Sequence, residues 1–227
     1  VECLESFGIK RDQIATGLYP IDVTFWKDSK AALRNVTEEI ESRFSSDSFV
    51  VIAVTKMTER ENPIAVIRAF ARLKDRLPNA CLIFVGDGNL RPDIEKFIRE
   101  NSLEGSTYFP GLVPYKRLPA YYGAADVFLH APEKEPWGIS VLEAMACGLP
   151  VVLTKSVGSG ADLLIPRKTG VWATSSTPED IAISLEQAAA IAANPGTADQ
   201  VEHAVARFDV AVAAETLEVL VDRLQSR

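Results

Sequence analysis

Two glutamates eight residues apart, Glu135 and Glu143, frame the stretch of the chain that is best suited to chemistry. Between them, Pro136 and Gly138 predict a tight turn, and the apolar residues that follow predict a helix. The first backbone amides of a helix lack internal partners and carry partial positive charge, so they suit a phosphate group. Glu143 lies five residues past Gly138, or about 7.5 Å along the helix axis. This arrangement could hold a ribose at Glu143, a diphosphate at the turn and a further group at Glu135, in the order that a nucleotide-sugar presents them.

Residues 135–152, Glu-Pro-Trp-Gly-Ile-Ser-Val-Leu-Glu-Ala-Met-Ala-Cys-Gly-Leu-Pro-Val-Val, resemble the Glu-x7-Glu signature of family 4 glycosyltransferases. These are retaining enzymes of the GT-B fold. Without the surrounding motif, two glutamates at this spacing would more often be solvated surface charges. The resemblance implies a catalytic role for Glu135 in positioning the donor sugar, and binding of the ribose hydroxyls by Glu143. It also implies donor contacts from the residues around the turn, which are Trp137, Gly138, Ile139 and Ser140.

The same family places a basic pair after the first strand of this domain, where the pair neutralises the leaving diphosphate. Lys56 matches the first position and is the second residue expected to be catalytic. The second position, five residues later, falls on Glu61, which reverses the expected charge. Arg60 is adjacent, and since a guanidinium binds phosphate through a planar fork, it is expected to bind the donor instead. The alternative is that Lys56, Arg60 and Glu61 form a solvated loop.

Two further segments resemble family elements near the donor. Gly86 and Gly88 belong to a Gly-Asp-Gly turn after a predicted strand, where glycine lets the backbone approach a ligand closely. An ordinary strand-to-helix turn would explain the same glycines. The segment Phe-Pro-Gly-Leu-Val-Pro, residues 109–114, resembles the loop that contacts the nucleobase mainly through backbone groups. It adds Leu112 and Val113 to the predicted site.

The sequence shows no metal-binding motif. His130 and His203 are the only histidines, and neither has a metal-ligand partner at a suggestive spacing. His130 follows a predicted strand and precedes the Glu135 loop, where it could do polar work near the donor, while His203 is expected on an exposed helical surface. The resemblance implies that no metal or cofactor is needed, because helix amides and basic residues take the place of a cation at the diphosphate.

Composition indicates an ordinary globular protein of 227 residues with a net charge of −7. A protein that binds nucleic-acid phosphates would need a basic stripe, so no nucleic-acid partner is expected. Cys81 and Cys147 lie in apolar surroundings and are expected to be small core residues in a reducing cytoplasm. No stretch approaches the roughly 20 apolar residues that a membrane span needs.

Short apolar runs alternate with helical patterns along most of the chain. Strands are predicted at 49–55, 81–85, 107–109, 127–130 and 151–153, and helices at 30–44, 63–77, 93–101, 178–193 and 198–225. This alternation predicts an α/β fold, a Rossmann-like parallel sheet with helices on both faces and a helical C-terminal extension. Ligands bind beyond the carboxyl ends of such strands, so the predicted site residues should converge on one cleft.

The resemblance covers nearly the whole chain but only one half of a GT-B enzyme, the C-terminal domain that binds the donor. Residues 1–27 are expected to contain the interdomain linker and a first strand region, because Tyr19-Pro-Ile-Asp22 resembles the Asn-Gly-Val-Asp of the family linker. Residues 28–227 are expected to form the nucleotide-sugar donor-binding domain. The missing N-terminal domain would bind the acceptor and make any peripheral membrane contact. The chain begins at Val1 without a methionine, so it is interpreted as a fragment.

The resulting hypothesis is a cytoplasmic hexosyltransferase of polysaccharide or glycolipid biosynthesis. It would move a sugar from a nucleoside diphosphate such as UDP or GDP to an acceptor with retention of configuration. Similarity to the family implies a front-face mechanism, in which the leaving phosphate helps to deprotonate the acceptor. Alone, this half is expected to be weakly active or inactive, because domain closure assembles the site. One alternative is a stand-alone nucleotide-sugar binding module or the donor subunit of a split enzyme, and another is a related GT-B phosphorylase or epimerase.

Overall fold

One parallel sheet organises the chain in the computed structural model, which describes residues 2–14, 19–30 and 34–225. Within these ranges the sheet has six strands in the order β3-β2-β1-β4-β5-β6. The strands are β1 Phe49–Val54, β2 Ala80–Val85, β3 Thr107–Gly111, β4 Val127–His130, β5 Val151–Leu153 and β6 Gly170–Trp172. The strand order reverses between β1 and β4, and sheets of this kind bind ligands at that point, beyond the carboxyl ends of the strands.

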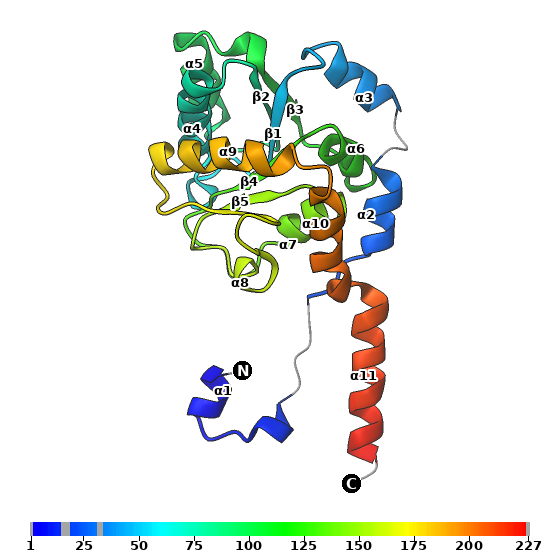
Figure 1. Ribbon diagram of the computed structural model, residues 1–227. Coiled ribbons are helices and arrows are strands. Elements are labelled where there is room, and N and C mark those ends of the chain that lie inside the picture. The colour runs from blue at the N-terminus through cyan, green and yellow to red at the C-terminus, as the bar shows by residue number, and fades with distance from the viewer. Residues whose placement is uncertain (1, 15–18, 31–33, 226–227) are drawn as a thin grey trace.

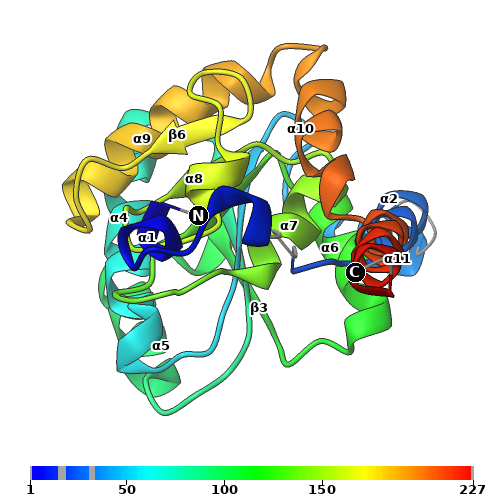
Figure 2. The same ribbon diagram turned by 90° about the horizontal axis from the view of Figure 1, so that it is seen from below.

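Helices cover both faces of the sheet (Figure 1; Figure 2). On one face, Phe70 and Leu73 belong to a core beneath α4, α5 and α9. The bounds of these helices are α4 Pro63–Arg76, α5 Arg91–Glu100 and α9 Pro178–Ala192. On the other face, Trp26, Tyr122 and Phe208 belong to a second core. The helices there are α2 Val23–Ser29, α3 Arg34–Glu41, α6 Leu118–Gly123, α7 Ile139–Ala146 and α10 Thr197–Val205.

The predicted fold class is confirmed. The strands β1 to β5 lie where the apolar runs predict them, and β2 and β4 are buried along their whole length. Burial on both faces explains why these strands are continuous apolar runs in the sequence and show no alternation of polar and apolar residues.

The remaining helical elements are α1 Glu2–Ser6, α8 Gly160–Leu163 and α11 Val210–Gln225, with the 3₁₀ turns η1 Arg11–Gln13, η2 Glu59–Glu61, η3 Glu104–Ser106, η4 Tyr115–Arg117 and η5 Ala206–Phe208.

Several elements differ from the sequence prediction. The short strand β6 was not predicted, and neither was α2. Asp22, interpreted as part of a turn, caps α2, because its Oδ1 accepts a hydrogen bond from Phe25 N at 2.8 Å. The helix predicted over 30–44 was too long: α3 begins at Arg34 and ends at Glu41, and residues 31–33 lie outside the described part.

The long helix predicted at 198–225 is interrupted. α10 ends at Val205, and η5 and an extended Asp209 separate it from α11. Phe208 is fully buried, which holds this segment against the core, and Asp209 Oδ1 accepts a hydrogen bond from Ala211 N at 2.8 Å at the start of α11. From there α11 runs away from the body of the domain (Figure 1).

The N-terminal segment contacts the domain at Ile21. This residue forms an isolated bridge with Asp209, whose Oδ2 also accepts a hydrogen bond from Val23 N at 3.0 Å. Elsewhere the described residues of 1–27 contain helical elements and no strand. Residues 15–18, part of the expected strand region, lie outside the described residues. The division into a linker at 1–27 and a domain at 28–227 stays a prediction.

The expectations from composition agree with the structure where it tests them. Cys81 and Cys147 are buried, as predicted for core residues. Burial raises the pKa of both thiols, that of Cys147 to about 12, so they remain protonated at neutral pH. None of the helices in the described ranges combines the length and apolar character that crossing a bilayer requires.

Gly86 and Gly88 bring the loops after β1 and β2 into contact. A Cβ on Gly86 would lie 1.9 Å from the carbonyl oxygen of Thr55, and one on Gly88 would lie 2.4 Å from that of Met57. Gly86 also has a φ of 133°, which favours glycine. Met57 N donates a hydrogen bond to Asp87 O at 2.9 Å and joins the two loops. Both glycines therefore have a packing role that the sequence prediction did not include.

We expect Gly86→Ala to lower the free energy of unfolding by about 2 kcal/mol or more, because the new Cβ overlaps backbone and the φ angle is strained. The matched control is Gly105→Ala, since a Cβ at that position meets nothing within 4 Å. Urea unfolding followed by circular dichroism measures both variants. Equal unfolding midpoints for the two would contradict the packing role.

Candidate active site

The loops that follow β1, β2 and β3 enclose a cavity at the carboxyl edge of the sheet. Its volume is about 220 Å³. Four predicted site residues line it, which are Lys56, Gly86, Leu112 and Val113. The structure therefore brings together residues from three separate loops, whereas the predicted site residues from Glu135 to Glu143 do not line this cavity. A larger cavity of about 620 Å³ lies near β6, α9 and α10 and contains none of the predicted site residues.

α7 begins at the same edge of the sheet, directly after Gly138. Gly138 has a φ of 93°, which a glycine adopts without strain, and this lets the chain turn into the helix. The residues from Val141 to Ala146 are buried, so α7 is held firmly against the sheet. The helix predicted to start near Trp137 begins at Ile139. Its first amides lie at the carboxyl edge of the sheet, where a ligand is expected.

Glu135 is fixed by backbone hydrogen bonds to the loop after β5. Its N–H donates to Ser156 O at 3.2 Å, and Gly158 N donates to its carbonyl oxygen at 2.9 Å. The side chain, which is 19% exposed, accepts a hydrogen bond from Trp137 N at 3.1 Å. This carboxylate thus covers one turn amide that the sequence prediction left open to a phosphate. The amides at the start of α7 remain the phosphate-binding candidates.

Trp137 links the start of α7 to the two ends of the chain. Its ring lies 5.8 Å from the ring of Tyr19 and 5.8 Å from that of Phe208, centroid to centroid. The indole Nε1 is buried and has no hydrogen-bond partner within the described ranges. After Trp137, Ile139 is exposed and Ser140 is half-buried, so both are accessible at the turn. The packing role of Trp137 was not predicted.

Glu143 is buried in the helix, and Tyr122 positions it. The residue is 8% exposed, and Tyr122 Oη donates a hydrogen bond to Glu143 Oε2 at 3.2 Å. Burial raises the pKa of Glu143 to about 7, and the hydrogen bond from Tyr122 partly opposes that rise. Burial also raises the pKa of Tyr122, which keeps its phenol protonated as a donor. The sequence analysis did not include Tyr122 in the site, because no spacing relates it to Glu143.

Arg60 lies next to the carboxylates of Glu135 and Glu61. Its Nη2 is 3.7 Å from Glu135 Oε2, and its Nε is 3.8 Å from Glu61 Oε1. Glu61 is only 14% exposed on its side chain, and its Oε2 accepts a hydrogen bond from Thr55 Oγ1 at 3.1 Å. The structure thus places Arg60 next to Glu135, and its binding of the donor stays a prediction. Glu61 is a partly buried residue of the site and not a solvated loop charge.

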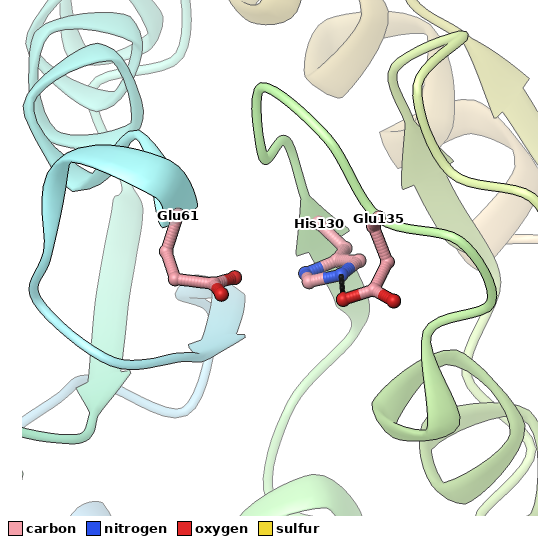
Figure 3. Close-up of side chains that lie close together, drawn as sticks. All are labelled: Glu61, His130 and Glu135. Atoms are coloured by element: carbon pink, nitrogen blue, oxygen red, sulfur yellow. Dashed lines mark ion pairs between the residues drawn. The ribbon is translucent and has the colours of Figure 1, made fainter.

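His130, the last residue of β4, lies beside Glu61 and Glu135 (Figure 3). Its Nε2 is 4.0 Å from Glu135 Oε2, and one potential ligand atom from each of the three residues lies within 4.8 Å of the others. Burial lowers the pKa of His130 to about 4, partly opposed by the Glu135 carboxylate, so the ring is neutral at pH 7. The sequence analysis did not find this group of three, because no regular spacing connects its members. His203 is exposed on α10, as predicted.

The sequence model of the family "Glycosyl transferases group 1" matches residues 36–204, which include all the predicted site residues. This chain belongs to the group 1 glycosyl transferases. The glycosyltransferase class implied by the signature around Glu135 and Glu143 is confirmed at that level.

Two relatives of this chain are also glycosyltransferases. An uncharacterized glycosyltransferase of Methanocaldococcus jannaschii is 30% identical over 141 residues, which cover 62% of this chain and 36% of the relative. The GDP-mannose-dependent alpha-(1-6)-phosphatidylinositol monomannoside mannosyltransferase of Mycolicibacterium smegmatis is 30% identical over 131 residues, or 55% of this chain and 34% of the relative. The match thus spans about a third of the length of these group 1 relatives.

Solved structures share the fold at low sequence identity. A glycosyltransferase from Rickettsia africae superposes with a TM-score of 0.81 at 18% identity, covering 100% of this chain and 61% of that one. Anabaena HepE in complex with UDP gives a TM-score of 0.77 at 22% identity, with the same shares of coverage, 100% and 61%. The C-terminal domain of a group 1 glycosyl transferase from Francisella tularensis gives 0.68 at 18% identity, covering 84% of this chain and 99% of that one. These likenesses support the Rossmann-like fold.

The buried Glu143 predicts a pH-dependent stability. Its pKa is near 4.5 in the unfolded chain and about 7 in the fold, so between these values the folded state holds a proton that the unfolded state has lost. The contribution of Glu143 to the free energy of unfolding is therefore fully present below pH 4.5 and is lost as the pH rises towards 7. Relative to Glu143→Gln, the free energy of unfolding of the wild type should fall by up to about 3 kcal/mol over this range.

Urea unfolding at several pH values between 5 and 7 measures this difference. The lowered pKa of His130 makes the free energy of unfolding change with pH in the opposite direction. Because His130 is present in both proteins, its effect cancels when the two are compared. Glu133→Gln, at an exposed position, is the matched control and should follow the wild type. A constant difference between the wild type and Glu143→Gln would show that Glu143 titrates normally in the fold.

Proposed function

We propose that this chain binds a nucleoside-diphosphate sugar and forms the donor half of a retaining hexosyltransferase of the family 4 type. One observation carries the proposal: α7 begins at the carboxyl edge of the sheet between a partly exposed Glu135 and a buried Glu143. Amides at the start of a helix favour a diphosphate, because they lack internal partners and lie at the positive end of the helix dipole. The carboxylates on either side suit the hydroxyl groups of a sugar and a ribose.

The proposed donor would extend along the carboxyl edge of the sheet. The ribose hydroxyls would donate hydrogen bonds to Glu143, and the sugar would lie beside Glu135. The base would enter the cavity next to Gly86, where the loop of Leu112 and Val113 offers backbone groups. Gly88 lets the loop after β2 pack closely against the backbone of the loop after β1, which keeps these loops together. The turn contacts to the diphosphate are proposed for Trp137, Gly138, Ile139 and Ser140.

The reaction would exchange one bond at the anomeric carbon for another on the same face of the sugar. The bond from that carbon to the diphosphate oxygen breaks, and its electron pair stays on the diphosphate. The acceptor hydroxyl oxygen bonds to the carbon, and its proton goes to a phosphate oxygen of the leaving group. Lys56, Arg60 and the α7 amides would stabilise the charge that develops on the diphosphate, because positive groups already in place need no rearrangement during the reaction.

The acceptor is proposed to bind to a second half of the enzyme. The Francisella C-terminal domain, which this chain covers almost completely, supports this arrangement, as do longer relatives of which this chain covers about a third. Residues 1–27 would then lead into the second half, and residues 28–227 would bind the donor. Because closure of two domains would complete the site, the chain alone should transfer sugar weakly or not at all.

UDP and GDP are the nucleotides proposed for the donor. A GDP-mannose-dependent mannosyltransferase is among the relatives, and the Anabaena structure contains UDP. The sugar nucleotide is the substrate, and the proposed reaction needs no organic cofactor.

A second candidate function is a stand-alone nucleotide-sugar binding module or the donor subunit of a split transferase. The acidic Glu61, at the position where the family pattern has lysine, favours it, because a negative charge there opposes the charge that develops on the diphosphate during transfer. The gene upstream of Val1 distinguishes the two. An open reading frame that continues into a Rossmann-like segment supports the two-domain transferase, and a start codon there supports the subunit.

Calorimetric titration of the chain with UDP, GDP and ADP tests the donor site. We expect at least one of the three to bind. Glu143→Ala should weaken that binding by at least about tenfold, because the ribose hydroxyls lose a buried acceptor. Glu143→Gln, which keeps the volume of the side chain, separates this loss from a packing defect.

The matched control is Glu133→Ala, an exposed glutamate in the loop that contains Glu135, and its dissociation constant should equal that of the wild type. An unchanged affinity in Glu143→Ala would refute the ribose role of this residue. Failure of all three nucleotides to bind the wild type would refute the donor site itself.

A further inference from the structure

Three side chains from separate segments converge beside the turn that leads into α7 (Figure 3). Glu61 belongs to η2 after β1, His130 ends β4, and Glu135 lies in the loop before α7. One nitrogen or oxygen atom of each lies within 4.8 Å of those of the other two. Only the fold brings them together, at the place where the proposed donor would have its diphosphate and sugar.

His130 directs an unsatisfied nitrogen into this cluster. The residue is 5% exposed, and its Nε2 has no hydrogen-bond partner among the residues that the structure describes. Leaving such a group unpaired costs about 1–3 kcal/mol, so buried polar atoms in native proteins normally bind something. The ring stacks on Phe128 at a centroid distance of 5.9 Å, which restricts its orientation. Nε2 and Glu135 Oε2 are 4.0 Å apart, too far for a hydrogen bond but close enough to share an ion.

The two carboxylates carry more negative charge than their neighbours neutralise. Arg60 has 61% of its side chain exposed and stays 3.8 Å from Glu61 and 3.7 Å from Glu135, so it stabilises them only weakly. Thr55 Oγ1 donates to Glu61 Oε2 at 3.1 Å, which orients that carboxylate without adding charge. A diphosphate would bring further negative charge to the same place. The lysine of the family pattern would offset it, whereas Glu61 adds to it.

We infer that Glu61, His130 and Glu135 bind a divalent cation, and that this ion replaces the family lysine as the positive group at the donor diphosphate. The ion site rests on the three side chains alone, while its link to the diphosphate rests on the proposed function. The expectation of a metal-free site was based on the helix amides together with the basic pair of the family pattern. This chain keeps only Lys56 of that pair.

The ligand set suits Mn²⁺. Carboxylates favour Mg²⁺, Ca²⁺ and Mn²⁺, whereas imidazole favours transition metals, and Mn²⁺ accepts both kinds of ligand. Octahedral bonds of about 2.1 Å place neighbouring ligand atoms about 3 Å apart and opposite ones about 4.2 Å apart. The His130–Glu135 pair, at 4.0 Å, would need to close by about 1 Å to be neighbouring ligands, and a pair as far apart as 4.8 Å by up to about 1.8 Å. Positions not filled by protein atoms would take water and diphosphate oxygens.

Binding of Mn²⁺ to the chain tests the site directly. Electron paramagnetic resonance follows the free ion, whose signal falls as the protein binds it. We expect one strong site in the wild type, with Glu61→Gln and His130→Leu each weakening it by at least about tenfold. Glu61→Gln keeps the size of the side chain and an acceptor for Thr55, so its fold should be intact even where that of His130→Leu is not. Circular dichroism verifies the fold of each variant.

Glu133→Gln is the matched control, because Glu133 is exposed and lies two residues before Glu135. Its affinity for Mn²⁺ should equal that of the wild type. Equal affinities in the wild type and Glu61→Gln would overturn the site, and so would a wild type that binds no Mn²⁺.

Nucleotide binding then separates this inference from the proposed function. Mn²⁺ should tighten binding of UDP or GDP by about tenfold in the wild type and have a smaller effect in Glu61→Gln. Glu61→Lys should bind the nucleotide without Mn²⁺ about as well as the wild type does with it. If the affinity of the wild type for the nucleotide is the same with and without Mn²⁺, the role of the ion at the diphosphate is overturned and the proposed function stands. Mn²⁺ binding by a chain with no affinity for any nucleoside diphosphate would overturn the proposed function and leave the ion site standing.

Discussion

The placement of Glu135 depends on the contact between the loop before α7 and the loop after β5. Two backbone hydrogen bonds join these loops, from Glu135 N to Ser156 O and from Gly158 N to Glu135 O. Gly158 has no room for a side chain, since a Cβ there would lie 2.0 Å from the carbonyl oxygen of Pro136. The same contact holds the turn that starts α7. It therefore determines where the first helix amides point and where Glu143 enters the core.

Most of the fold could be predicted because most of its strands are largely buried and because α4 and α9 are long. β1 to β5 appear as apolar runs, and α4 and α9 show a helical period bounded by proline. β6 has three residues and begins with Gly170, so no pattern marks it. The break before α11 depends on burial of Phe208 and on the pairing of Asp209 with Ile21. Such contacts between distant parts of the chain have no local signal.

The candidate site could be predicted where a contiguous signature covers it, but not where it depends on tertiary contacts. Glu135 and Glu143 belong to one motif, and the loops that converge beside them follow successive strands. Tyr122 lies in another helix, and only the packing of α6 on α7 shows that it donates a hydrogen bond to Glu143. His130 and Glu61 also come from different strand ends. Their approach to Glu135 follows from the parallel order of β1 and β4, which the sequence implies only in outline.

The burial of Glu143 has a consequence for the thermodynamics of ligand uptake. With a pKa of about 7, this carboxyl carries a proton in about half of the chains at neutral pH. Ribose hydroxyls donate to the ionised form, so on the proposed placement each nucleotide that enters expels a fraction of a proton into the solvent. The heat of mixing then includes the ionisation enthalpy of the buffer. Occupancy of the pocket becomes a joint function of nucleotide concentration and hydrogen-ion activity.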